Sequence, residues 1–299
     1  MKAALAALLL AAAAPSAAPH VLRAQAWTAS DPALAHALTH APRECVGPLS
    51  QPAEAGRALF RSPGLLGGPA ARLGLSCNAC HSNGRVNAAF FLPELTNRAG
   101  AADVTSEWAS KVRGDGVMNP RPIPDLAGVG LRPTHGRLAD PSLEHFVHGV
   151  IEEEFQGQPP SPEGFDDLMA YLRALDANCA GEVSIGLTDA ADDVRRAIAA
   201  AQRADAPTAS ALMLAAQDAV GRLVERLPET RFGGARMALE TLARELGAMR
   251  YSADVHAALD TGVAGWSARF DAIVAAIAPR ERQTYFDEAT LRAALNRRS

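Results

Sequence analysis

The sequence has no large excess of charge of either sign. Its net charge is −4 and its isoelectric point lies near 6.1. This balance gives no basic footprint for nucleic acid or for an anionic membrane surface, so we expect neither as a partner. Aromatic residues are scarce at 5%, whereas apolar residues reach 48%, which is ample for a sizeable core. A length of 299 residues favours two domains.

The apolar run near the N-terminus is too short to span a bilayer. It extends from Ala3 to Ala14, and Pro15 ends it well before the roughly 20 residues that a spanning helix needs. One lysine precedes the run, and Ala24-Gln25-Ala26 follows it as a small-x-small cleavage site. We therefore expect residues 1–26 to be a signal peptide. The mature chain would be periplasmic, with no integral membrane segment.

Convincing alternation of apolar and polar residues is lacking throughout, which disfavours β-sheet. Helical spacing is clear over 140–155, with Asp140 as the expected N-cap, and over 161–176. A further helix is expected from Ser50, and a short one opening at Thr105-Ser106. Dense prolines and glycines between 93 and 140 exclude long regular elements there. The first half is thus predicted to be helical with long loops.

The composition changes after Gly181. Residues 183–299 hold no cysteine and one histidine, His256. Their apolar residues recur at helical spacing between proline breaks and predict a helical bundle, with segments at 189–204, 208–227, 229–249, 252–277 and 282–297. The fold class is therefore predicted to be all-α, with one domain over 27–182 and a second, of unassigned role, over 183–299.

The sequence has a single Cys-x-x-Cys pair, Cys77 to Cys80, with His81 directly behind it. A closed zinc site usually draws its ligands from two such pairs. A thiol oxidoreductase places its pair on a helix packed against a sheet, and no βαβ pattern surrounds this one. Covalent attachment of one haem c accounts for every position, because each cysteine adds to one vinyl group and the adjacent imidazole ligates the iron. Haem c is also attached outside the cytoplasm, which agrees with export.

Two cysteines, Cys45 and Cys179, remain once the haem is assigned. An oxidising compartment is expected to pair spare thiols, so we expect a Cys45–Cys179 disulfide. Two unrelated buried thiols are the alternative.

The residues around the pair resemble class I c-type cytochromes. Gly56, in the stretch GRALFRS, looks like the glycine that lets the first helix of such a domain cross its last helix, and Tyr171-Leu172 looks like the crossing partner. Residues 119–147 are similar to the segment after the haem motif in the bacterial cytochrome c peroxidase and MauG group. Those peroxidases carry two haem motifs, whereas this chain carries one. The resemblance, which covers roughly residues 50–178, therefore implies a cytochrome c-like domain with a single haem.

The identity of the sixth iron ligand would distinguish an electron carrier from a haem enzyme. Met118 lies in a proline-rich loop, as the methionine ligand of class I cytochromes does, and would close the iron for electron transfer. His135 lies where the peroxidase group keeps a loop histidine, and an open or labile sixth site would permit peroxide chemistry. Arg121 is a candidate partner for a haem propionate, and Trp108 and the pair Phe90-Phe91 are candidate pocket walls.

The resemblance implies a periplasmic cytochrome that exchanges single electrons with redox partner proteins. The alternative is a peroxidase-like haem enzyme with an open or labile sixth site. A third interpretation is a sensor whose C-terminal helices dock a partner. His145 and His148 have a spacing that suits a metal, but beside Glu144 and Glu152 they more often mark a solvated helix face.

Overall fold

The computed structural model describes residues 20–30, 32–176 and 180–297. Helices dominate these residues, which confirms the all-α prediction at the level of fold class. Across the described ranges, no helix is both long enough and apolar enough to cross a membrane. Most of the predicted signal peptide lies outside the described residues, and so does Cys179.

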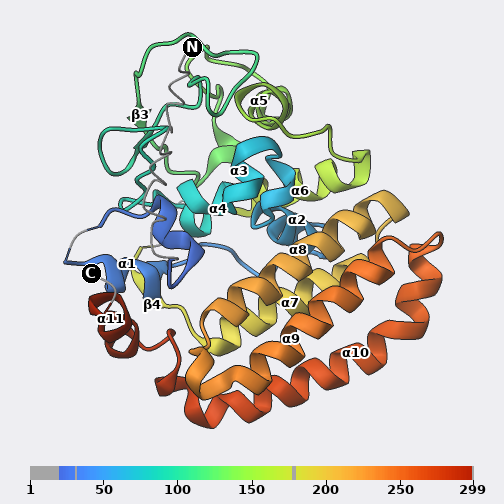
Figure 1. Cartoon of the computed structure of the whole chain (residues 1–299). Coiled ribbons are helices and arrows are strands. Elements are labelled where there is room, and N and C mark those ends of the chain that lie inside the picture. The colour runs from blue at the N-terminus through green and yellow to red at the C-terminus, as the bar shows by residue number, and fades with distance from the viewer. Residues whose placement is uncertain (1–19, 31, 177–179, 298–299) are drawn as a thin grey trace, which may run out of the picture.

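The first part of the chain forms a helical module with long loops (Figure 1). Its helices and strands are α1 (Leu34–Thr39), β1 (His40–Pro42), α2 (Gln51–Phe60), α3 (Gly68–Leu73), α4 (Cys77–Cys80), β2 (Ala101–Ala102), β3 (Arg121–Pro122), α5 (Leu143–Gly149), α6 (Pro162–Ala174) and β4 (Glu182–Ser184). A π-helical turn (Val150–Glu154) continues α5. Short 3-10 turns occupy Arg23–Trp27, Pro63–Leu65, Ser82–Gly84 and Val129–Leu131.

Local capping explains where two of the helices begin. The Ser50 hydroxyl accepts a hydrogen bond from the backbone N–H of Ala53 (3.4 Å), and α2 starts at the next residue with Pro52 in its first turn. Ser161 opens α6 in the same way, accepting from Gly164 N–H at 3.2 Å. Both starts agree with the sequence prediction.

Two predictions of helix starts are wrong. The N-cap of α5 is Ser142, because Asp140 uses its carboxylate to accept from the Ser142 backbone N–H (2.8 Å). Only turns form at Thr105, because its N–H and hydroxyl both donate to the Asp103 carboxylate, at 3.0 and 2.7 Å. A side chain that satisfies the backbone in this way competes with helix formation.

Two antiparallel strand pairs were not predicted. β1 pairs with β4, with His40 opposite Ser184, and β2 pairs with β3, with Ala101 opposite Pro122. Each strand has two or three residues, too few to show alternation in a sequence. The β1–β4 pair joins the start of the helical module to the segment that leads into the bundle.

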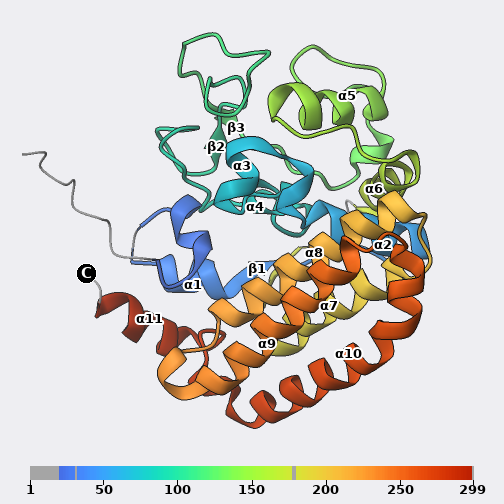
Figure 2. The same ribbon diagram turned by 45° about the vertical axis from the view of Figure 1, so that its right-hand side comes forward.

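The second part of the chain is a bundle in which the first four helices lie side by side (Figures 1 and 2). The helices are α7 (Leu187–Ala201), α8 (Ala206–Glu225), α9 (Glu229–Arg250), α10 (Val255–Ile277) and α11 (Glu288–Asn296). The last one begins later than predicted, because residues Ala278–Gln283 form a 3-10 turn and Asp287 caps α11 by accepting from Thr290 N–H (2.8 Å).

Helix α2 lies between α6 and the bundle. A Cβ atom added at Gly56 would lie 1.9 Å from the carbonyl oxygen of Asp167, so α2 and α6 touch backbone to backbone at this glycine. The rings of Phe60 and Tyr171 meet at the same crossing, 5.2 Å apart. On its other side α2 contributes Ala55 and Leu59 to the apolar core of the bundle. The two parts of the chain therefore share a core through α2.

Residues just before the predicted cleavage site belong to this packed structure. Leu22 is 2% exposed and packs with Leu38 and Leu291. Arg23 forms an ion pair with Asp218 of α8 (2.9 Å) and donates its backbone N–H to Glu225 at 2.9 Å. Cleavage after Ala26 would remove these contacts.

Candidate functional site

The two cysteines of the Cys-x-x-Cys-His element lie on one helical turn. α4 consists of Cys77–Cys80, preceded by Ser76 in an extended conformation. Both thiols are free and half-buried. Cys77 packs against two apolar clusters, one containing Phe90, Leu92 and Leu95 and the other containing Phe60, Tyr171 and Leu172. The turn thus presents two thiols at a boundary between apolar surfaces.

His81 is oriented by a distant backbone carbonyl. Its Nδ1 lies 2.9 Å from the carbonyl oxygen of Pro124, in the loop before the 3-10 turn at 129–131. That oxygen can only accept, so Nδ1 carries the proton and the lone pair is on Nε2. A second partner of this kind fixes the tautomer and ring direction of metal-binding histidines. Burial lowers the pKa of His81 to about 4, against the opposing effect of the Pro124 carbonyl, so the imidazole is neutral at physiological pH.

The thiols are poorly suited to redox or zinc chemistry on their own. Burial raises the pKa of Cys77 to about 12, and burial together with Cys77 also raises the pKa of Cys80. A reactive cysteine needs a lowered pKa, because the thiolate is the nucleophile. Within the described ranges, the one group of three or more His, Cys, Asp or Glu side chains close enough to share a metal ion contains neither cysteine. The described residues therefore give Cys77 and Cys80 neither a lowered pKa nor the further ligands that a zinc site needs.

The loop after His81 is tied to α4 by asparagine side chains. Asn83 has a positive φ of 53°, and its N–H donates to the Asn78 side chain (2.9 Å). Asn87 donates its backbone N–H to Cys80 O (3.0 Å) and its amide to Ala79 O (2.8 Å). These bonds hold the segment that carries Cys80 and His81 in one conformation.

Met118 lies in a strongly exposed loop. Its side chain is 47% exposed, and the neighbouring Val117 is 59% exposed. Val112, Leu131 and Leu138 are also exposed, so five of the seven exposed large apolar side chains in the described residues fall between 112 and 138. Exposed apolar side chains are thus concentrated in these loops.

His135, unlike Met118, is buried. It is 7% exposed, its backbone pairs with that of Asp140 in both directions at 2.8 Å, and its ring stacks on Phe146 at 6.2 Å. Arg121 is exposed on β3, and the described residues give it no ion pair. The structure brings Cys77, Cys80 and His81 together and leaves the choice of sixth ligand, and the role of Arg121, as predictions.

Two of the three predicted pocket walls, Phe90 and Trp108 but not Phe91, lie in the apolar cluster beside the site. Phe90 is fully buried and Trp108 is half-buried, and both belong to the apolar cluster that Cys77 and Cys80 contact. Cys45 is disulfide-bonded, and Cys179, its predicted partner, lies outside the described residues.

Sequence reasoning missed a buried ionic network next to the site. The Glu44 carboxylate accepts from Arg57 (2.9 Å), from Arg61 (3.0 Å) and from the Tyr171 hydroxyl (2.6 Å). Burial raises the pKa of Glu44, but the charges of Arg61 and Arg57 outweigh that effect and bring it to about 2. Arg61 also donates to the Asn83 side chain at 2.7 Å, so the network reaches the loop after His81. No spacing in the sequence signals this long-range pairing.

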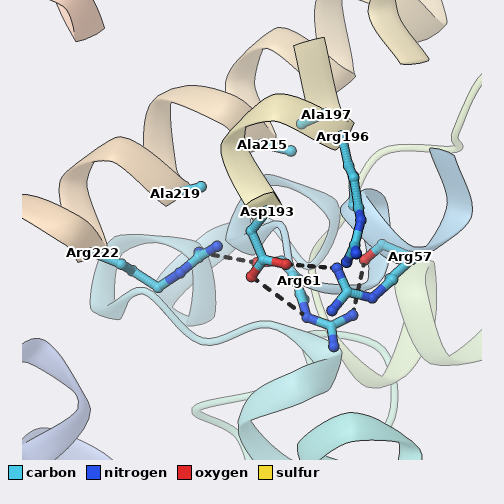
Figure 3. A pocket seen from close by; sticks show the side chains of 9 residues that line it. Arg57, Arg61, Asp193, Arg196, Ala197, Ala215, Ala219 and Arg222 are labelled. Carbon is cyan, nitrogen blue, oxygen red and sulfur yellow. Dashed lines mark hydrogen bonds and ion pairs between the residues drawn. The ribbon is translucent and has the colours of Figure 1, made fainter. Parts of the chain in front are cut away.

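The same arginines line a pocket between α2 and the bundle (Figure 3). Asp193 of α7 points into it and accepts from Arg57 at 2.6 Å. Arg196 pairs with Glu54 at 3.6 Å, and Arg222 pairs with Asp218. Each guanidinium already has a carboxylate partner, so this pocket is an ion-pair network that joins the two parts of the chain.

Comparison with protein-family models, with curated proteins and with solved structures finds no match to this chain.

Proposed function

We propose that this chain is a periplasmic mono-haem c-type cytochrome that carries single electrons between redox partner proteins. One haem c would be held by thioether bonds to Cys77 and Cys80, with His81 as an axial iron ligand. The observation that supports this most strongly is the hydrogen bond from His81 Nδ1 to Pro124 O, at 2.9 Å. It leaves Nε2 of a neutral imidazole available on the residue that directly follows the two thiols.

The haem iron, when bound, supplies the one-electron redox chemistry. The chain supplies the environment. The apolar clusters beside α4 would shield the group from water, the Pro124 carbonyl would keep the His81 ring in one orientation, and the asparagine bonds would fix the turn that carries the thiols. Met118 is the first choice for the sixth ligand and His135 the second. The close α2–α6 crossing at Gly56 also supports the likeness to class I cytochromes.

The test is covalent haem attachment. The full chain is expressed in a host that matures c-type cytochromes, and its intact mass and optical spectrum are measured. We expect a mass increase of one haem and a red protein. Cys77→Ser and Cys80→Ser should each lose one thioether bond, and the double variant should lose the covalent haem. His145→Ala is the matched control, because its side chain is 82% exposed. A colourless wild type with the mass of the polypeptide alone would overturn the proposal.

Peroxide chemistry is the second candidate function. The exposure of Met118 favours it, because a ligand on an exposed loop can leave the iron and open the sixth position. Carbon monoxide added to the reduced protein separates the two. A carrier closed by Met118 should bind it slowly, and Met118→Ala should bind it fast. Fast binding by the wild type would favour the enzyme, and His135→Ala would then test whether that histidine lies near the open position.

A further inference from the structure

Two histidines and two glutamates that are distant in the sequence meet at the surface where α1, β4 and α11 come together. The rings of His36 and His40 stack with their centroids 4.0 Å apart. Glu288 Oε2 lies 3.3 Å from His36 Nδ1 and 3.9 Å from His40 Nδ1. Glu182 Oε2 lies 3.0 Å from His36 Nε2. One donor atom each from His36, His40 and Glu288 falls within 4.8 Å of the others.

The packing of α11 against α1 and the pairing of β4 with β1 position the side chains of this cluster. α11 is fixed by Leu291, which is fully buried against Leu38 of α1 and so places Glu288 beside that helix. β4 is fixed by its pairing with β1, where His40 lies opposite Ser184. Glu182 is two residues from Ser184, so it shares the face of the strand pair that carries His40.

The donor set selects the kind of ion. Imidazole nitrogen and carboxylate oxygen together suit zinc and other first-row divalent metals, whereas calcium and magnesium take oxygen ligands. Zinc bound at 2.0–2.2 Å in a tetrahedron needs donor atoms about 3.4 Å apart, so the cluster has to contract by roughly 1 Å. The three side chains can move that far, because His36, His40 and Glu288 are 44%, 25% and 30% exposed.

The charges at this place also suit a cation. Glu182 and Glu288 converge on His36, and Arg292 forms an ion pair with Glu288. Arg292 bonds to Oε1 of Glu288, whereas the histidines face Oε2. The oxygen that a metal would use is therefore not the one that Arg292 occupies.

We propose that His36, His40 and Glu288 form a zinc-binding site that fastens the C-terminal helix α11 to α1, with Glu182 orienting the His36 ring by accepting from its Nε2–H. Zinc bound here stabilises the folded chain by mass action, since the unfolded chain does not bring these residues together. The site uses none of the residues of the proposed haem site, so the two proposals can fail independently.

The experiment is a calorimetric titration of the chelator-treated full chain with zinc chloride. We expect one equivalent to bind. His36→Gln and His40→Gln should each weaken binding at least about 100-fold, because loss of even an outer-shell partner typically costs 10–100-fold. His145→Gln is the matched control, since it removes an exposed histidine that faces a single carboxylate, Asp140. Hydrogen exchange should slow in α11 on zinc addition in the wild type and in His145→Gln only.

Two results would overturn the proposal. One is a wild type that takes up no zinc at tens of micromolar, and the other is unchanged affinity in both histidine variants, which would mean adventitious surface binding elsewhere. Circular dichroism checks that the variants fold. If a histidine variant does not fold, Glu288→Gln provides the same test from α11, and unchanged zinc affinity in that variant would count against the site.

Discussion

Gly56→Ala tests the packing of α2 against α6. The added methyl carbon would lie 1.9 Å from Asp167 O and 2.9 Å from the Cα atom of Leu168. Cβ atoms essentially never approach other atoms within 3.0 Å, so the two helices must separate by about 1 Å. Both contacts are backbone atoms, so no side chain can rotate away to make room. α2 cannot retreat freely either, because Leu59 on its other side is buried in the core of the bundle.

The size of the effect follows from two opposing contributions. Overpacking of a well-packed core costs about 1–3 kcal/mol and occasionally more. Alanine is a better helix former than glycine by about 1 kcal/mol, which offsets part of that cost. Because the clash is with backbone on a helix confined from both sides, we expect the free energy of unfolding to fall by about 2 kcal/mol. For a chain of this size the corresponding fall in melting temperature is about 3 °C.

Chemical denaturation of the full chain measures this change. Gly265→Ala in α10 is the matched control, because an added Cβ there meets nothing within 4 Å and the residue is exposed. The control should be as stable as the wild type or more stable by up to about 1 kcal/mol. A Gly56→Ala variant that matches its control in stability would refute the close crossing.

Three further predictions follow from other parts of the structure. The pKa of Glu44 falls from 4.5 to about 2 on folding, so its charge stabilises by about 3 kcal/mol above pH 4.5 and this is lost as pH falls toward 2. Glu44→Gln should thus lower the unfolding free energy at pH 7 but little near pH 2, and a pH-independent loss would contradict this. Trp266→Ala, at a side chain 1% exposed, should cost about 3–5 kcal/mol in urea unfolding, and a loss under 1 kcal/mol would show that the bundle core is not packed as described. The contacts of Leu22 and Arg23 favour a mature chain that retains both residues, so any cleavage should occur before Leu22 rather than after Ala26 as the sequence predicts. The mass of the mature chain measures this, and a chain starting after Ala26 would show that their contacts are dispensable.

Much of the local structure could be read from the sequence. Ser50 and Ser161 start their helices as predicted, because a cap and the N–H that it accepts from lie three residues apart. Helices α7 to α10 lie within three residues of their predicted bounds, since each carries its own apolar periodicity and Pro207, Pro228 and Pro279 follow three of them, whereas α11 begins later than predicted. The prediction that Asp140 caps α5 is wrong because two polar side chains compete within three residues, and spacing does not decide between Asp140 and Ser142.

The sequence by itself determined the chemistry that the chain can carry: two thiols and an imidazole within five residues, on a segment that can form one helical turn. Only the tertiary structure decided how these groups are presented. The carbonyl that orients His81 is 43 residues away in the chain, and Glu288 reaches His36 across 252 residues. Every residue has a backbone carbonyl, so the sequence does not mark the one that accepts from His81. Contacts across such separations depend on how the helices pack. Hydrogen bonds within a turn are set by neighbouring residues, whereas these distant ones form only when the whole core has closed.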